Sequence, residues 1–207
     1  MSMKGISNTW HRRYLDLAEH ISSWSKDPST KVGAVAIGEV GQILSTGYNG
    51  FPRNISDTNE RLTDREEKYS LTVHAETNCI YNATWNGVSL RGATLYVNGL
   101  PPCSEGCAQA IIQVGIVDVV IPDPRDKVAN QDKWRVSYER TKQLFYESYV
   151  NIIEIDQSGR ISEPVKELVF KREQEAELER LKNGAPRGGL MFPYMQRSSQ
   201  TRWTVIR

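Results

Sequence analysis

Apolar residues recur along the chain with two different spacings, which together predict helices that alternate with short strands. Spacing of three and four residues predicts a first helix, with apolar positions at Trp10, Tyr14, Leu17, Ala18, Ile21 and Trp24. Asp27-Pro28 should end this helix, because proline cannot continue it. Further helices are expected at 74–85, 105–114 and 133–147, and short apolar runs predict strands at 32–37, 43–46, 93–97, 117–122 and 150–155.

This order of elements predicts an α/β domain, a three-layer α/β/α sandwich around a mixed sheet of about five strands. The first two strands, joined by a turn at 39–42, should form a hairpin, whereas helical crossovers join the later ones. Residues 47–52 are expected to be loop, because two glycines and a proline fit neither regular element. The polar residues 53–70 are expected to form an excursion on the surface.

The pattern changes after Gln157-Ser158-Gly159, so we expect a domain at 1–157 and a C-terminal extension at 158–207. Within the extension, 163–182 is typical of a charged amphipathic helix, and 184–207 is an irregular tail with four arginines and several aromatic residues. Such a tail can bind single-stranded nucleic acid or lie across a partner subunit. We favour the second possibility, a tail that lies across a partner subunit as an arm. Four arginines would contact only a short stretch of nucleic acid, and the rest of the chain is close to neutral.

Composition indicates a soluble, globular, cytoplasmic protein. The 207 residues are 39% hydrophobic and 25% charged with a net charge of +1, so nucleic acid and membrane are not expected partners. No apolar run reaches the length of about 18 residues that spans a bilayer, and the first residues lack the core of a signal peptide. Three cysteines, an odd number, argue against a disulfide framework and leave thiolates available as metal ligands.

The strongest chemical signal is His74-Ala75-Glu76 together with Cys103 and Cys107. One imidazole and two thiolates suit Zn²⁺ and leave the fourth tetrahedral position for water, so we expect one zinc per chain. Glu76 is then placed to move protons in a hydrolytic reaction. The structural alternative, a core histidine with two ordinary buried thiols, explains each residue separately but not their arrangement. Cys79 falls on the apolar face of its helix and is expected in the core.

The spacing of these residues constrains where the metal can sit. Positions i and i+2 of a helix diverge by about 200°, so His74 and Glu76 converge only if the metal lies over the N-terminal end of the helix. The positive end of the helix dipole there favours thiolates. Cys103 and Cys107 are one residue further apart than in the usual P-C-x-x-C motif. They can still face one way on a regular helix, or Gly106 can absorb the extra residue before the helix begins.

At these motifs the chain resembles the cytidine deaminase superfamily, and within it the deoxycytidylate (dCMP) deaminases. H-x-E followed by P-C-x-x-C is the signature of zinc nucleobase deaminases. The stretches 25–35, 46–53 and 74–83 resemble further family motifs and read SKDPSTKVGAV, TGYNGFPR and HAETNCIYNA. The resemblance covers about 10–155 and leaves out the last fifty residues.

The resemblance implies roles for individual residues. His74, Cys103 and Cys107 would bind zinc, and Glu76 would shuttle protons to the base. The expected substrate contacts are Asn49 to the deoxyribose, the backbone of Ala75 to the base edge, and Ser25 and Lys26 to the phosphate. Asn49 could instead be a turn residue, and Ser25 with Lys26 a solvated helix end. Trp134 and Tyr138 could approach the base or simply be core aromatics.

Family members that respond to dCTP and dTTP use the loop that corresponds to Gly47, Tyr48, Gly50 and Arg53. The resemblance therefore implies an effector site there, with Mg²⁺ accompanying a nucleotide triphosphate, and a homo-oligomer, either dimer or hexamer. Some relatives bind a second zinc in the following segment. Because the segment between Arg53 and Val73 has no histidine or cysteine, a single zinc is expected.

The resemblance implies hydrolytic deamination of dCMP to dUMP in pyrimidine nucleotide biosynthesis, with zinc-activated hydroxide as the nucleophile and a deoxyribonucleotide as substrate. Three alternatives stay open at this point. A related enzyme would act on dCTP, 5-methyl-dCMP or dAMP, and an editing enzyme would act on DNA or RNA. A non-catalytic zinc protein would only bind nucleotides.

Overall fold

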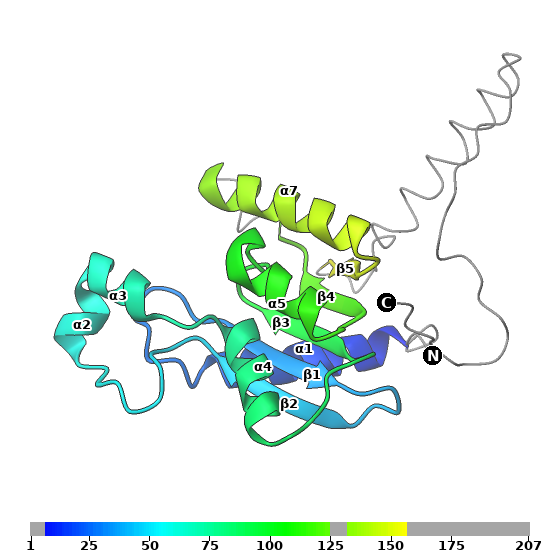
Figure 1. Cartoon of the computed structure of the whole chain (residues 1–207), viewed down its shortest axis with the longest axis horizontal. Helices are drawn as coiled ribbons and strands as arrows, with labels where there is room; N and C mark the ends of the chain where they lie inside the picture. The colour runs from blue at the N-terminus through cyan, green and yellow to red at the C-terminus, as the bar shows by residue number, and fades with distance from the viewer. Residues whose placement is uncertain (1–6, 125–131, 157–207) are drawn as a thin grey trace, which may run out of the picture. The chain divides into compact units, whose positions relative to one another are not determined.

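The computed structural model describes residues 7–124 and 132–156, which form one five-stranded sheet with helices on both faces (Figure 1). The strands are β1 (Gly33–Ile37), β2 (Ile43–Tyr48), β3 (Thr94–Asn98), β4 (Asp118–Pro122) and β5 (Asn151–Ile155). Their order is β2-β1-β3-β4-β5. β1 is antiparallel to β2 and β3, while β3, β4 and β5 are parallel. The predicted mixed sheet with its N-terminal hairpin is confirmed.

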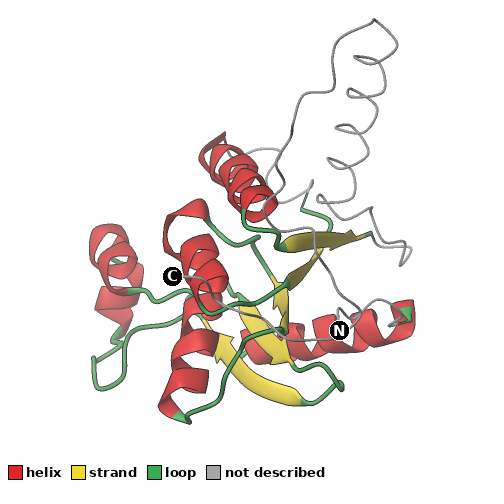
Figure 2. Cartoon of the chain, turned by 45° about the vertical axis from the view of Figure 1, so that its right-hand side comes forward, coloured by secondary structure: helices red, strands yellow, loops and turns green. Residues whose placement is uncertain are grey.

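Helices cover both faces of the sheet, as Figure 2 shows. The described helices are α1 (Asn8–Ser22), α2 (Asn59–Thr63), α3 (Arg65–Leu71), α4 (Ala75–Trp85), α5 (Gln109–Gln113) and α7 (Asp132–Glu147). α1 packs on one face of the sheet, and α4, α5 and α7 pack on the other. Alternation along β1 explains the two cores, because Val35 and Ile37 face α1 whereas Ala34 and Ala36 face α4. α1 ends at Ser22, several residues before the predicted stop at Asp27.

The end of β2 corrects the prediction that 47–52 is loop throughout. Gly47 and Tyr48 continue the strand, where they pair with Ala34 and Gly33 of β1. The physical reason is the closeness of α4. A Cβ at Gly47 would lie 2.4 Å from the carbonyl oxygen of Ala75 and 2.3 Å from the amide nitrogen of Cys79. Gly47 is therefore needed for helix–strand packing rather than for a turn, and it fixes the position of the helix that carries His74.

We expect Gly47→Ala to lower the free energy of unfolding by about 1–3 kcal/mol, because backbone atoms cannot yield to the added methyl group. Urea denaturation followed by circular dichroism measures this change. Gly50→Ala is the matched control, since the nearest atom to its added Cβ would be a Tyr48 ring carbon at 3.9 Å. Equal stability of Gly47→Ala and the parent protein would contradict the packing argument.

The segment 53–70 lies mostly at the surface, as predicted, and it contains helices that its polar composition did not indicate. These are α2 and most of α3, whose N-caps Thr58 and Asp64 each accept a hydrogen bond from a backbone amide. Each helix is short and buries only one side chain, Leu62 at 7% and Lys68 at 8% exposure. This segment supplies one wall of the cavity described below.

The predictions for the C-terminal extension, a helix at 163–182 and an irregular tail, lie outside the described residues, and so does the proposed boundary after 157. In the part of the chain that the structure describes, no helix has the length and apolar character needed to cross a membrane.

Candidate metal centre and active site

Three ligand atoms converge at the N-terminal end of α4. His74 is the N-cap of this helix in an extended conformation, and its side chain makes no capping hydrogen bond. Its Nδ1 lies 3.2 Å from Sγ of Cys107 and 3.5 Å from Sγ of Cys103. All three ligand atoms lie within 4.8 Å of one another. The structure thus brings together the three residues that the sequence predicted as metal ligands.

A kinked turn, η1 (Ser104–Ala108), accommodates the extra residue between the two cysteines. Ala108 N donates to Cys103 O at 2.9 Å, and Gly106 has φ +97°, which favours glycine. α5 begins only at Gln109, so the predicted helix from 105 is wrong at its start. Of the two arrangements left open by the sequence, the structure has the one in which Gly106 absorbs the additional residue.

α7 holds this turn in place from the side. Ser104 N donates to Ser137 Oγ at 3.0 Å, and Thr141 Oγ1 donates to Pro102 O at 2.9 Å. Ser104 and Thr141 are both buried. Hydrogen bonds to the backbone on both sides of Cys103 therefore fix the position of the thiol, which is the kind of support that a ligand site requires.

The three residues fit a zinc ion. Tetrahedral coordination with the usual Zn–N and Zn–S bond lengths separates a nitrogen and a sulfur ligand by about 3.6 Å. The observed Nδ1–Sγ distances of 3.2 and 3.5 Å are close to this value. A hydrogen bond from Cys107, supported by His74, lowers the pKa of the Cys103 thiol to about 4, whereas the hydrogen bond to Cys103 and burial raise the pKa of Cys107. A bound cation would favour the thiolate form of both cysteines.

Glu76 stands beside this centre on the first turn of α4. Its side chain is only 3% exposed. Burial raises the pKa of Glu76 to about 7, although the nearby His74 charge acts in the opposite direction. A carboxyl group with this pKa can both accept and release a proton near neutral pH.

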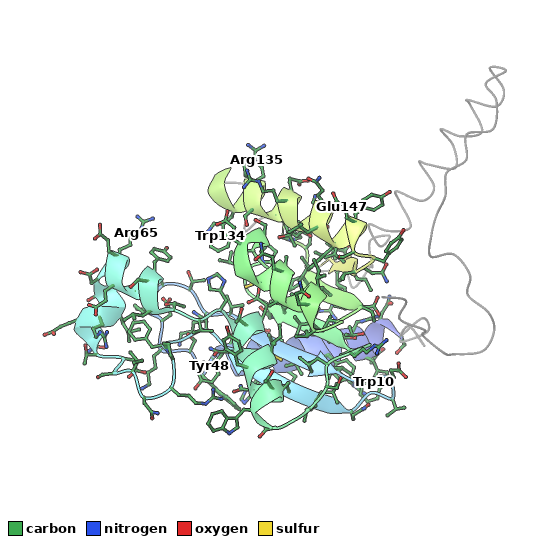
Figure 3. All side chains as sticks on the ribbon, viewed as in Figure 1. Trp10, Tyr48, Arg65, Trp134, Arg135 and Glu147 are labelled. Carbon is green, nitrogen blue, oxygen red and sulfur yellow. The ribbon has the colours of Figure 1, made fainter. Side chains whose placement is uncertain are left out.

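A cavity of about 160 Å³ opens beside these residues. His74, Ala75 and Glu76 form part of its wall, and its other lining residues come from 27–32, Asn49, 68–72, Leu100, Pro101 and Trp134. Trp134 lies at the first turn of α7 (Figure 3). Tyr138, the other aromatic residue considered near the base, is buried in the core instead, and its hydroxyl donates to Glu154.

Asn49 and Ala75, two of the predicted substrate-binding residues, line this cavity. Asn49 is also structural, since its Oδ1 accepts from Val32 N at 2.8 Å and its Nδ2 donates to Thr30 O at 2.9 Å. Both predicted readings of Asn49, turn residue and substrate contact, are therefore compatible with its position. Ala75 is fully buried at the start of α4, where the first backbone N–H groups of a helix have no partner within it.

Ser25 and Lys26, expected near the phosphate, do not line the cavity. The Ser25 hydroxyl is buried and donates to the Asn49 carbonyl at 2.8 Å. Lys26 points outward and pairs with Asp57 at 2.8 Å. Three neighbours of these residues in the fold line the cavity instead, namely Asp27, Ser29 and Lys68. The sequence analysis singled out neighbouring positions of this loop but not the side chains that line the cavity.

The residues predicted for an effector loop occupy several different positions. Gly50 forms an isolated antiparallel bridge with Val73, and Tyr48 is 40% exposed at the end of β2 (Figure 3). Arg53 donates to Asn82 and lies over the Trp85 ring at 5.3 Å. Cys79 is fully buried, as expected for a core thiol.

Fold and site together define a zinc-binding deaminase, and the comparison with known proteins agrees. Residues 8–122 match the family model of the cytidine and deoxycytidylate deaminase zinc-binding region. The chain therefore belongs to the cytidine and deoxycytidylate deaminase family.

Individual relatives support the same assignment. An uncharacterized deaminase of Aliivibrio fischeri from the luxG 3′ region is 36% identical over 69% of this chain and 91% of its own length. A probable deoxycytidylate deaminase of Drosophila melanogaster is 43% identical over 55% of this chain and 58% of its own length. The dCMP deaminase of cyanophage S-TIM5, solved with dCMP and dUMP, has a TM-score of 0.54 at 22% identity, covers 73% of this chain and is itself fully covered. This last similarity concerns the fold.

Proposed function

We propose that this protein catalyses the hydrolytic deamination of dCMP to dUMP with one bound Zn²⁺. The observation that supports this most directly is the convergence of His74, Cys103 and Cys107 within 4.8 Å, beside a buried Glu76 in the wall of the same cavity. The relative named as a probable deoxycytidylate deaminase supports dCMP as the substrate.

Glu76 would perform the proton transfers. When bound, zinc supplies Lewis-acid activation of a water molecule at neutral pH. As water adds to the ring carbon that bears the amino group, Glu76 would accept a proton from the water and deliver it to the ring nitrogen. Glu76 would then pass the second water proton to the amino group, so that the C–N bond breaks and ammonia leaves. Its pKa of about 7 suits both directions of transfer.

Ala75 and Asn49 would orient the substrate. The backbone N–H of Ala75, at the open end of α4, is available to an acceptor on the base edge. Asn49 would contact the deoxyribose through the amide N–H that is not donated to Thr30. Because Val32 and Thr30 fix the amide of Asn49 from both sides, the sugar would meet a preorganised group.

We also propose that the protein forms a homo-oligomer. Tyr81 and Trp85 on α4 are 53% and 77% exposed, and Trp24 and Tyr48 add further exposed aromatic rings. Surfaces of this kind are typical of protein interfaces. Regulation by dCTP and dTTP with Mg²⁺, through Gly47, Tyr48, Gly50 and Arg53, stays a prediction from the family resemblance.

Ammonia release by the zinc-loaded protein tests the proposal on dCMP, 5-methyl-dCMP, dCTP, dAMP and a single-stranded oligonucleotide. We expect turnover of dCMP with the highest kcat/KM of the set. A higher kcat/KM for another mononucleotide would mean that this nucleotide, and not dCMP, is the substrate. Turnover only of the oligonucleotide would identify an editing enzyme. If the zinc-loaded protein released no ammonia from any of these compounds, the result would contradict a deaminase acting on these bases.

A further inference from the structure

The cavity beside the metal centre carries its positive charge on one side chain. Among the described residues that line it, Lys68 of α3 is the only lysine or arginine. Its side chain is 10% exposed, and Nζ lies 3.2 Å from Asp27 Oδ1 and 2.6 Å from Ser29 Oγ. Because an ammonium group is buried only with compensating partners, these two contacts hold Lys68 in a defined position in the wall.

Asp27 pairs with this ammonium through an oxygen that it shares with other donors. Its Oδ1 also accepts hydrogen bonds from Ser29 N, Ser29 Oγ and Thr30 N at 2.8, 2.8 and 3.1 Å. Burial opposes ionisation, but the bonds from Ser29, Thr30 and Lys68 lower the pKa of Asp27, so its carboxylate is charged at neutral pH. An ammonium has three N–H donors, and the described residues accept from two of them. One donor is left for a ligand in the cavity.

Lys68 and the metal centre are close enough to contact the same small molecule. From Lys68 the chain completes α3 and reaches His74 through an extended connection, which limits the separation of their Cα atoms to about 15 Å. A nucleoside monophosphate carries base and phosphate on different sides of its sugar. A base held at Glu76 with its sugar at Asn49 therefore directs the phosphate away from the metal centre, to a part of the cavity where a cation is needed.

We propose that Lys68 binds the 5′-phosphate of the substrate, with Asp27 and Ser29 as its positioning residues. This inference rests on the proposed function, because it assigns the phosphate end of the same nucleotide site. It moves the phosphate contact from Ser25 and Lys26, for which the family resemblance implied this role, to a buried lysine on α3. Lys68 then determines the preference for a nucleotide over a nucleoside.

Substitution of Lys68 by methionine tests this assignment through the ratio of kcat/KM for dCMP to kcat/KM for deoxycytidine. The values of kcat/KM for dCMP and for deoxycytidine are measured on the same zinc-loaded preparation, so any inactive fraction cancels. We expect kcat/KM for dCMP to fall about 10- to 100-fold, as for the loss of a charged hydrogen bond. The value for deoxycytidine should change by less than about 2-fold. Lys142→Met, on α7, is the matched control and should leave both values unchanged.

The same preference can be measured without turnover. Calorimetric Kd values for dUMP and deoxyuridine should show that the parent prefers dUMP and that Lys68→Met loses this preference by a similar factor. Lys68→Arg, which keeps the positive charge, should retain part of it. Melting curves and zinc content show whether each variant is folded and loaded.

Two results would overturn the inference. If Lys68→Met lowered kcat/KM for dCMP and for deoxycytidine by the same factor, the lysine would only hold α3 against the 27–30 loop. Loss of the phosphate preference in Lys26→Met, with the preference intact in Lys68→Met, would return the contact to the surface lysine. Either result leaves the proposed function standing if the parent deaminates dCMP. Failure of the parent on dCMP refutes the function itself, while the dUMP and deoxyuridine affinities still test Lys68.

Discussion

Glu76→Gln should retain zinc and lose almost all deaminase activity, with kcat reduced by about 10²- to 10⁴-fold, the usual contribution of a positioned general acid–base group. Glutamine has nearly the same size and keeps an acceptor oxygen, but it cannot exchange a proton. Steady-state ammonia release with dCMP measures the loss, and elemental analysis of the same sample measures the metal.

The folded structure should tolerate this substitution well. Burial already favours the neutral form of Glu76, as its raised pKa of about 7 shows, and glutamine is neutral at every pH. A loss of activity can therefore be assigned to chemistry rather than to unfolding. Glu139→Gln, an exposed position on α7, is the matched control and should behave like the parent protein. Substantial turnover by zinc-loaded Glu76→Gln would refute the proton-transfer role.

The sheet and the convergence of the three candidate metal ligands were predictable from the sequence because their signals are local and redundant. Most strands are short apolar runs, although β2 extends beyond its apolar start into Ser45, Thr46 and Gly47. His74, Cys103 and Cys107 belong to residue types that rarely occur together without a metal. Their convergence required only that strands and helices alternate as predicted, which brings the starts of successive helices to the same edge of the sheet.

The lining of the cavity was not predictable in the same way. Lys68 lies in a strongly polar stretch, and nothing in its spacing distinguishes it from the exposed lysine at position 26. Its burial depends on α3 folding back against the 27–30 loop, a contact between positions about forty residues apart. The packing role of Gly47 could not be predicted for the same reason. This role depends on the close approach of α4, which is known only from the three-dimensional structure.

The two cysteines make the strongest test of the metal centre. Cys107→Ser should reduce the affinity for zinc on the order of 100- to 1000-fold, roughly one ligand's share of the binding free energy of a structural site. A serine hydroxyl keeps the small size of the thiol, but it stays protonated near neutral pH and does not replace a thiolate. Competition with a chelator of known affinity measures the zinc dissociation constant, and deaminase activity at low zinc should fall with it.

Cys79→Ser separates ligation from ordinary burial. Cys79 is fully buried in the apolar core and does not belong to the group of three clustered ligand atoms, and burial raises the pKa of its thiol to about 12. Its substitution should lower the free energy of unfolding by about 1–3 kcal/mol, because a hydroxyl group is placed in an apolar environment, but it should leave the zinc dissociation constant unchanged. If Cys107→Ser instead kept zinc as tightly as Cys79→Ser, Cys107 could not be a ligand. The kinked turn at Gly106 would then have no role in metal binding, and the metal would require a different set of donors.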